Sequence, residues 1–228
     1  MAKNIVILGG GASGFMAAIQ AASQLQNKGV EIKILERCDK VGRKILATGN
    51  GRCNLTNSNM SLDFFYGGNR ALISSVLQQF TLDDTLDFFA ELGLWTTEEN
   101  GKIYPYSLQA STVLDLLRQR AAELGVIEVC SFEVTAIQKV QKGFLLKNKQ
   151  GESVGADVLI MAAGGCASPS LGSNGTGHRL MASLGHRVTD LFPAITQIRT
   201  ETDVVKSIQG IKVNGTLISG LRKKIRSI

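Results

Sequence analysis

Three glycines and one acid near the start of the chain have the types and spacing needed to bind a dinucleotide. Gly9, Gly11 and Gly14 form a Gly-x-Gly-x-x-Gly run, and Glu36 follows at close to the roughly 20-residue spacing of such sites. The first glycine permits a tight turn, the second lets backbone N–H groups approach a pyrophosphate, and the third lets a helix pack on a strand. The acid can accept a hydrogen bond from a ribose hydroxyl. A glycine turn that holds no nucleotide is the alternative interpretation.

The elements around these residues are those that such a site requires. Residues 3–8 are apolar and predict a strand, residues 14–25 are rich in alanine and predict a helix, and residues 30–35 predict a second strand. The glycines therefore lie where a strand runs into a helix, and the helix N-terminus adds N–H donors and partial positive charge. Strand, helix, second strand and acid together make the glycine run much stronger evidence than it is alone.

The composition is that of a globular protein in a reducing compartment. The 228 residues are 44% hydrophobic and 19% charged, and no apolar run is long enough to cross a bilayer. The first strand begins so early that we expect no secretory signal. The four cysteines lack Cys-x-x-Cys spacing, which argues against a metal site and against a disulfide framework. We therefore expect a cytoplasmic protein with no membrane contact.

The net charge of +6 is modest, and part of it lies in a basic run at residues 222–226. No aromatic residue interleaves with these charges, so a solvated segment is favoured over a nucleic-acid surface. We expect no nucleic-acid partner, and the sequence leaves the oligomeric state open.

After Glu36 the chain departs from a simple dinucleotide-binding domain. Residues 41–57 are rich in Gly, Asn and Arg without periodicity and predict a loop. Residues 70–93 predict two amphipathic helices, the second capped by Thr81, and Asn100-Gly101 predicts a hairpin turn. The elements expected further along are a helix capped by Ser111 and ending near Leu124, strands at Cys130 to Val140 and at 144–147, a fully buried strand from Asp157 to Ala162, and a helix from Arg179 to Leu184.

This order of elements resembles the glutathione-reductase-like flavoproteins, in which a β-meander packs over the central sheet. The fold class that it implies is α/β: an FAD-binding Rossmann domain with a central parallel sheet and a meander, followed by the start of an inserted second domain. Gly42-Arg43-Lys44 and the run from Thr48 to Asn57 resemble the signature of one bacterial family, the aminoacetone-oxidase-like or bile-acid-reductase-like NAD(P)/FAD-dependent oxidoreductases. Residues 103–107, 158–165 and 172–177 resemble further segments of that family.

The resemblance implies FAD as the cofactor and NAD(P)H as a candidate electron donor. The cofactor residues that it implies are Gly9, Gly11, Ala12, Ser13, Gly14, Glu36, Arg37, Arg43, Lys44, Asn50, Gly51, Arg52, Asn54, Val134, Ala163 and Gly164. By it, the glycine run meets the diphosphate, Glu36 the adenosine ribose, Arg43 and Lys44 the phosphate charge, Val134 the adenine, and residues 50–54 the flavin ring. Solvated charges are the alternative for Arg43, Lys44 and Arg52. A small buried residue is favoured for Cys53, and no side chain is assigned as a catalytic base.

Members of that family are longer than this chain. We therefore expect residues 1–190 to form the FAD-binding domain without its C-terminal return segment, and residues 191–228 to begin an incomplete β-rich inserted domain. The predicted function is that of a truncated FAD-dependent oxidoreductase, which transfers electrons or hydride to or from a small-molecule substrate. A non-catalytic dinucleotide-binding remnant or interaction protein is the alternative. An NAD-only dehydrogenase is disfavoured because the meander would have no evident role in it.

Overall fold

The computed structural model describes residues 3–66, 69–192, 203 and 206. The chain divides into two compact units, Met1–Val188 and Thr189–Ile228. The inserted β-rich domain expected at residues 191–228 lies almost entirely outside the described residues, so it stays a prediction.

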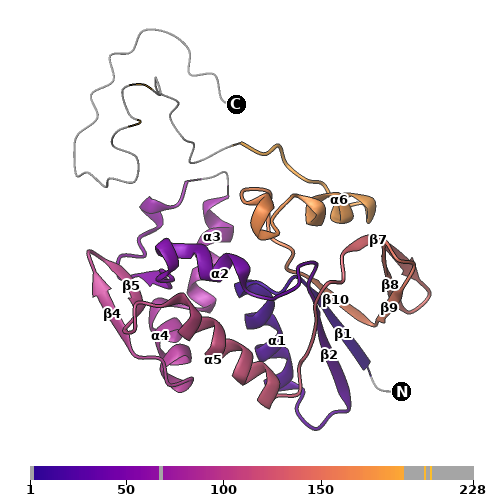
Figure 1. Cartoon of the computed structure of the whole chain (residues 1–228), viewed down its shortest axis with the longest axis horizontal. Coiled ribbons are helices and arrows are strands. Elements are labelled where there is room, and N and C mark those ends of the chain that lie inside the picture. Colours follow the sequence, from indigo (N-terminus) through magenta and orange to yellow (C-terminus); the bar gives the residue numbers. More distant parts are fainter. Residues whose placement is uncertain (1–2, 67–68, 193–202, 204–205, 207–228) are drawn as a thin grey trace. The chain divides into compact units, whose positions relative to one another are not determined.

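A parallel sheet forms the centre of the first unit (Figure 1). Its strands are β1 (Lys3–Leu8), β2 (Val30–Leu35), β6 (Ile127–Val129) and β10 (Val158–Met161), in the order β10-β1-β2-β6. Helix α1 (Ala12–Gln24) connects β1 to β2, as the sequence predicted. Because the strands are parallel, the carboxyl ends of β1, β2 and β10 meet at one edge of the sheet, which is where ligands bind in open α/β sheets.

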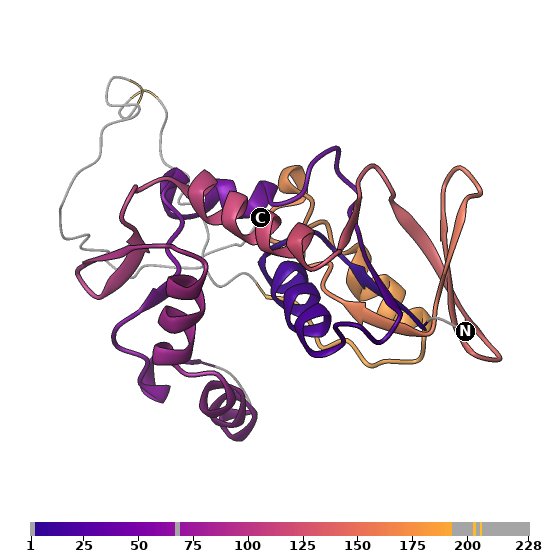
Figure 2. The same cartoon turned by 90° about the horizontal axis from the view of Figure 1, so that it is seen from below.

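Two antiparallel sheets complete the strands of this unit. The strands β7 (Val134–Val140), β8 (Gly143–Asn148) and β9 (Ser153–Ala156) form the expected meander. The strands β3 (Thr56–Asn57), β4 (Thr96–Glu99) and β5 (Lys102–Pro105) form a small sheet in the order β3-β5-β4, far from the meander in Figure 2. The other helices are α2 (Arg43–Ala47), α3 (Arg70–Gln79), α4 (Leu82–Glu91), α5 (Ala110–Glu123) and α6 (Thr176–Ser183), with 3-10 turns at Thr48–Gly51, Leu62–Phe64 and Pro169–Leu171. The predicted α/β Rossmann fold with a meander is confirmed.

Alternation along β1 divides the core into two parts. Ile5 and Ile7 pack into a cluster with α1 and α5, whereas Val6 and Leu8 pack into a second cluster with the meander and α6. Successive side chains of a strand point to opposite faces, so both faces of β1 are covered. The glycine run therefore leaves directly from a strand that is buried on both sides.

Two sequence-based expectations about this unit were wrong. Residues 41–57 are not a plain loop, because α2, a 3-10 turn and β3 lie within them and the buried Ile45 gives α2 an apolar anchor. The strand expected at Asp157 to Ala162 is not fully buried. Among the described residues β10 is an edge strand with β1 as its one neighbour, and its Val158 is 44% exposed.

Several elements begin at positions other than those predicted, and three of them have an identifiable local reason. Helix α5 begins at Ala110 after the N-cap residue Gln109, so Ser111 lies in its first turn and does not cap it. Helix α6 begins at Thr176 rather than Arg179, directly after a glycine in the left-handed conformation. Strand β7 begins at Val134 rather than Cys130, because the left-handed φ of 57° at Ser131 interrupts an extended chain.

Candidate cofactor site

The three glycines of the run are explained by different features of the structure. Gly9 has a φ of +116°, and a Cβ atom on it would collide with the backbone oxygen of Ala162. A Cβ atom on Gly14 would collide with the backbone oxygen of Gly9. Apart from its chain neighbours, a Cβ atom on Gly11 would meet no atom of the described residues within 4 Å, and Gly11 has an ordinary φ of −93°. Packing therefore explains Gly9 and Gly14, whereas Gly11 faces open space.

Gly11 lies at the N-terminus of α1. It is the N-cap residue of that helix, and no side chain caps the helix there. The backbone N–H groups of Ala12, Ser13 and Gly14 consequently lack partners within the helix. These groups carry the partial positive charge of the helix N-terminus, an arrangement that suits a phosphate.

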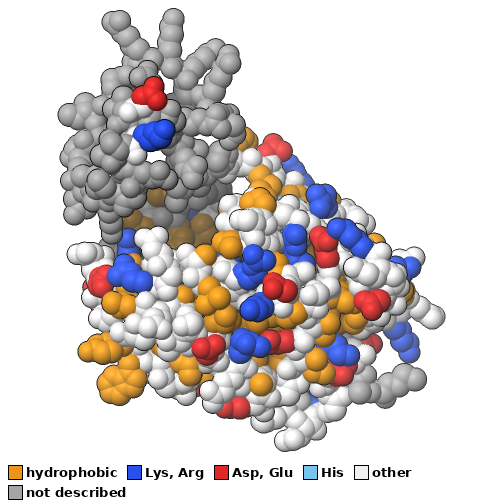
Figure 3. All heavy atoms as spheres, viewed as in Figure 1, with side chains coloured by type: hydrophobic (Ala, Val, Ile, Leu, Met, Phe, Trp, Pro, Cys, Tyr) orange, Lys and Arg blue, Asp and Glu red, His pale blue; other side chains and the backbone are white. Residues whose placement is uncertain are grey.

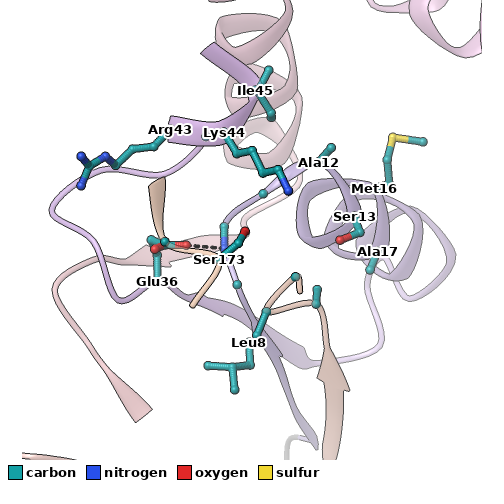
Figure 4. A pocket seen from close by; sticks show the side chains of 18 of the residues that line it. Leu8, Ala12, Ser13, Met16, Ala17, Glu36, Arg43, Lys44, Ile45 and Ser173 are labelled. Atoms are coloured by element: carbon teal, nitrogen blue, oxygen red, sulfur yellow. Dashed lines mark hydrogen bonds between the residues drawn. The ribbon is translucent and has the colours of Figure 1, made fainter. Parts of the chain in front are cut away.

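Glu36 holds the glycine run from the end of β2. Its Oε2 accepts a hydrogen bond from the Gly10 N–H at 2.8 Å (Figure 4), and its Oε1 accepts one from the Cys38 N–H at 2.9 Å. Each carboxylate oxygen has a further lone pair, so these bonds leave capacity for a ribose hydroxyl. The sequence predicted the ribose contact, which stays a prediction, and missed the structural one.

A cavity of about 1030 Å³ extends from the glycine run; we call it the large cavity. Most of the predicted cofactor residues line it, namely Gly9, Gly11, Ala12, Ser13, Glu36, Arg37, Arg43, Lys44, Asn54, Val134, Ala163 and Gly164. The cavity is also lined by residues 171–174 and 176–177, by Phe132 and Glu133, and by side chains of α1, α4 and α5. The fold thus brings most of the predicted residues, which lie far apart in the sequence, to one hollow.

Four predicted residues do not line the large cavity: Gly14, Asn50, Gly51 and Arg52. Arg52 donates from Nη1 to Glu99 Oε2 at 2.8 Å, and its guanidinium carbon lies 4.3 Å from the centre of the Tyr104 ring. The hydrogen bond to Glu99 raises the pKa of the Arg52 guanidinium above its ordinary value. Arg52 therefore fastens its loop to the β4–β5 hairpin, a role that the sequence did not predict.

The loop that Arg52 fastens has an unusual backbone. Asn50 and Cys53 have positive φ values of 56° and 58°, which residues other than glycine rarely adopt. Such conformations persist only where the surroundings hold them, and they gather at functional sites. Cys53 is buried, and this burial raises the pKa of its thiol. A small buried residue, the interpretation favoured from the sequence, agrees with this environment.

Four positively charged side chains line the large cavity. Arg37, Lys40, Arg43 and Lys44 line it, and Figure 4 shows Arg43 and Lys44 leaving α2 in opposite directions. The Arg43 guanidinium lies 3.9 Å from the Asp39 carboxylate, with both groups substantially exposed, so this ion pair is weak. On the face of the first unit seen in Figure 3, Lys and Arg side chains lie among exposed apolar ones.

Glu133, an acid that lines the large cavity, pairs with two neighbouring cations. Lys149 Nζ lies 2.7 Å from Glu133 Oε2, and Arg37 lies 3.9 Å from its other oxygen. The bond to Lys149 lowers the pKa of the Glu133 carboxyl below its ordinary value. Lys40 and Lys44 also line the cavity and form no ion pair among the described residues, so they remain available to an anionic ligand.

Comparison with known families decides the affiliation of the chain. A family model described as the HI0933-like protein Rossmann domain matches residues 3–222. The chain belongs to this family. It is a family of FAD-dependent oxidoreductases, so the resemblance stated from the sequence is confirmed at that level.

Two curated relatives of the HI0933-like chain are enzymes. A 3-dehydro-bile acid delta(4,6)-reductase of Clostridium scindens is 39% identical over 223 residues, which cover 98% of this chain and 54% of the relative. A ribosomal RNA dihydrouridine synthase of Escherichia coli is 29% identical over 205 residues, which cover 90% of this chain and 50% of that protein. The chain therefore spans about half the length of these relatives.

Solved structures with the same fold include two oxidoreductases. Adenylylsulfate reductase from Archaeoglobus fulgidus has a TM-score of 0.56 at 17% identity, covering 79% of this chain and 35% of that chain. A 3-ketosteroid-delta4-(5alpha)-dehydrogenase from Rhodococcus jostii has a TM-score of 0.51 at 15% identity, covering 71% and 46%. At these identities the likeness supports the fold alone.

The residues of the HI0933-like chain fit the FAD of its family. The open space at Gly11 and the free N–H groups of α1 suit a diphosphate, and the cations of the large cavity suit its charge. The volume is at the upper end of the roughly 300–1,000 Å³ of ligand pockets, as an extended dinucleotide requires.

No three His, Cys, Asp or Glu side chains among the described residues lie together as metal ligands. No helix in the same part of the chain combines the length and hydropathy needed to cross a membrane.

Sequence reasoning missed the apolar wall of the large cavity. Met16 and Ala17 line it from one face of α1 beside the polar Gln20, and Phe89 and Leu117 line it from α4 and α5. The helical spacing of residues 16, 17 and 20 after Ser13 could have indicated a second ligand-facing stripe on α1. In α4 and α5 no signal distinguishes a lining residue from an ordinary core residue.

Proposed function

We propose that this chain binds FAD in the large cavity and forms the cofactor-binding part of an NAD(P)H-dependent oxidoreductase. The open space beside Gly11 carries the proposal. Glycine loses more conformational entropy on folding than any other residue, and neither φ nor packing requires one at this position. Close approach of a diphosphate to the backbone supplies the missing reason.

Each wall of the cavity has a part in this proposal. The N–H groups at the start of α1 bind the diphosphate, and Lys44 and Arg43 offset its charge. Glu36 accepts from the adenosine ribose, and the backbone of Val134 holds the adenine. Asn54, Ala163 and Gly164 lie beside the flavin ring, which supplies hydride transfer when bound. The apolar faces of α1, α4 and α5 exclude water from that ring.

The relatives support a finer assignment of the reaction. The names of both describe a reduction: one of double bonds in a bile acid, the other of uridine to dihydrouridine. We propose that the reaction is the addition of a hydride and a proton to a carbon–carbon double bond conjugated with a carbonyl group. The 39% identity to the Clostridium scindens enzyme supports a small-molecule substrate, and it favours the bile-acid-reductase-like group over enzymes that act on RNA. The scattered free cysteines support a reducing, cytoplasmic location.

Anaerobic spectroscopy tests this function. The full chain is loaded with FAD and mixed with NADH or NADPH, and we expect the visible flavin absorbance to fall. A conjugated enone added afterwards is expected to restore the absorbance. A chain that takes up no FAD refutes the proposal as a whole. FAD that binds but is not reduced refutes the electron donor and leaves the non-catalytic remnant as the better interpretation.

A further inference from the structure

A second cavity lies between α3, α4 and residues 56–62; we call it the small cavity. Its volume is about 360 Å³, within the roughly 300–1,000 Å³ of small-molecule sites. Phe80 and Thr85 line both this cavity and the large one, so the two hollows meet at these residues. A molecule in the small cavity would therefore lie next to whatever fills the large one.

Half of the lining of the small cavity is apolar. The side chains concerned are Met60, Leu62, Leu77, Phe80 and Leu82. Phe80, the C-cap residue of α3, is 46% exposed although it is a large aromatic residue. A partner that covered this ring would remove apolar surface from water, which favours an apolar ligand.

The rest of the lining is polar but uncharged. It consists of Thr56, Ser74, Gln78, Thr81 and Thr85, and no Asp, Glu, Lys, Arg or His is among the described residues that line this cavity. An ionised group placed here would lose its water without gaining an opposite charge. Thr85 Oγ1 donates to the Thr81 backbone oxygen at 2.8 Å. Within residues 3–66 and 69–192, Ser74 and Gln78 form no side-chain hydrogen bond, so they can bond a carbonyl or hydroxyl group.

We propose that the small cavity is the substrate site and binds the uncharged, largely apolar part of the substrate through a carbonyl or hydroxyl group. The contrast between the two cavities supports this division, because four cations line the large cavity and none lines the small one. Phe80 then lies between substrate and cofactor. This inference rests on the proposed function, since FAD in the large cavity is what makes the neighbouring molecule a substrate.

Competitive displacement of a dye tests the chemistry of the small cavity. Nile red, an uncharged apolar dye, is bound to the full chain with and without FAD, and 2-acetonaphthone or 2-naphthoate is added as competitor. The two competitors share one ring system and differ in charge. We expect the ketone to displace the dye roughly tenfold more effectively than the carboxylate, because the lining offers the carboxylate no cation. Equal displacement, or no dye binding, overturns the proposal.

Matched variants locate the site. Leu77 lines the small cavity, whereas its neighbour Val76 on α3 is 56% exposed and lines neither cavity. Leu77→Gln is expected to weaken ketone binding roughly fivefold and Val76→Gln to leave it unchanged, because only the first removes apolar lining. Ser74→Ala, a smaller change, is expected to weaken binding of the ketone but not of naphthalene. Equal effects of the two glutamine variants place the dye elsewhere and overturn the site.

The same samples separate this proposal from the proposed function. None of the three substituted residues lines the large cavity, so FAD affinity is expected to stay unchanged in every variant. A chain that binds no FAD but shows the ketone preference refutes the proposed function and leaves the small cavity a ligand site. A chain that binds FAD but shows no ketone preference refutes the substrate site alone.

Discussion

Replacement of Gly11 by alanine separates ligand binding from folding more sharply than any other change in the glycine run. Apart from the chain neighbours of Gly11, the new methyl group would meet no atom of the described residues within 4 Å, and the φ of −93° suits alanine. Alanine is a poorer N-cap residue than glycine. It also lowers the conformational entropy of the unfolded chain, which stabilises the folded state by about 0.4–1 kcal/mol. We therefore expect the free energy of unfolding to change by less than about 1 kcal/mol, which shifts the melting temperature by about 2–4 °C in a domain of this size.

The effect of Gly11→Ala on FAD binding is expected to be much larger. The methyl group occupies the space in which a diphosphate would approach the first-turn N–H groups. The loss of one hydrogen bond to a charged group is worth about 1.5–3 kcal/mol, which weakens binding at least about tenfold. Fluorescence titration with FAD measures the affinity, and thermal unfolding of the same samples measures stability.

Gly155→Ala is the matched control for this experiment. Gly155 also has an ordinary φ, and apart from its chain neighbours no atom of the described residues lies within 4 Å of its Cβ position, but it lies in β9 and does not line the large cavity. We expect this variant to bind FAD as the unchanged chain does. The reasoning is refuted if Gly11→Ala keeps full FAD affinity, or if both variants lose it equally.

Three further predictions concern stability and reactivity. Gly14→Ala drives a methyl group into a backbone oxygen, so we expect a loss of about 1–3 kcal/mol in the free energy of unfolding, measured by denaturant titration, with or without FAD. Cys53 is buried with a raised thiol pKa, so iodoacetamide at neutral pH should alkylate the exposed Cys166 first, as followed by mass spectrometry; faster labelling of Cys53 would contradict its burial. The hydrogen bonds from Thr81 lower the pKa of the Asp84 carboxyl, so this cap stabilises the fold above the unfolded-state pKa of aspartate and is lost as pH falls through the lower folded value. Asp84→Asn should flatten that acid limb of the stability curve, and an unchanged limb would refute the assignment.

Local rules explain the parts of the fold that the sequence predicted well. The apolar runs of β1 and β2 and the glycines between them encode a β-α-β unit within about 35 residues, with the spacing that is typical of this motif. The cap of α4 is equally local, because Thr81 and Asp84 lie three positions apart and hydrogen-bond to each other.

Long-range contacts explain what the sequence could not predict. Arg52 meets Glu99 and Tyr104 only because the β4–β5 hairpin folds against its loop, and nothing in the loop itself encodes that partner. The position of β10 at an edge of the described sheet depends on which strands pair, not on its own apolar residues. The apolar wall of the large cavity likewise forms where three helices separated in sequence converge.

A crystal structure of the full chain with FAD tests the central claim most directly. We predict that oxygen atoms of the diphosphate lie within hydrogen-bonding distance of the N–H groups of Ala12 and Ser13, close to Gly11. The adenosine ribose is predicted beside Glu36. FAD bound elsewhere, or a diphosphate remote from Gly11, would contradict the account.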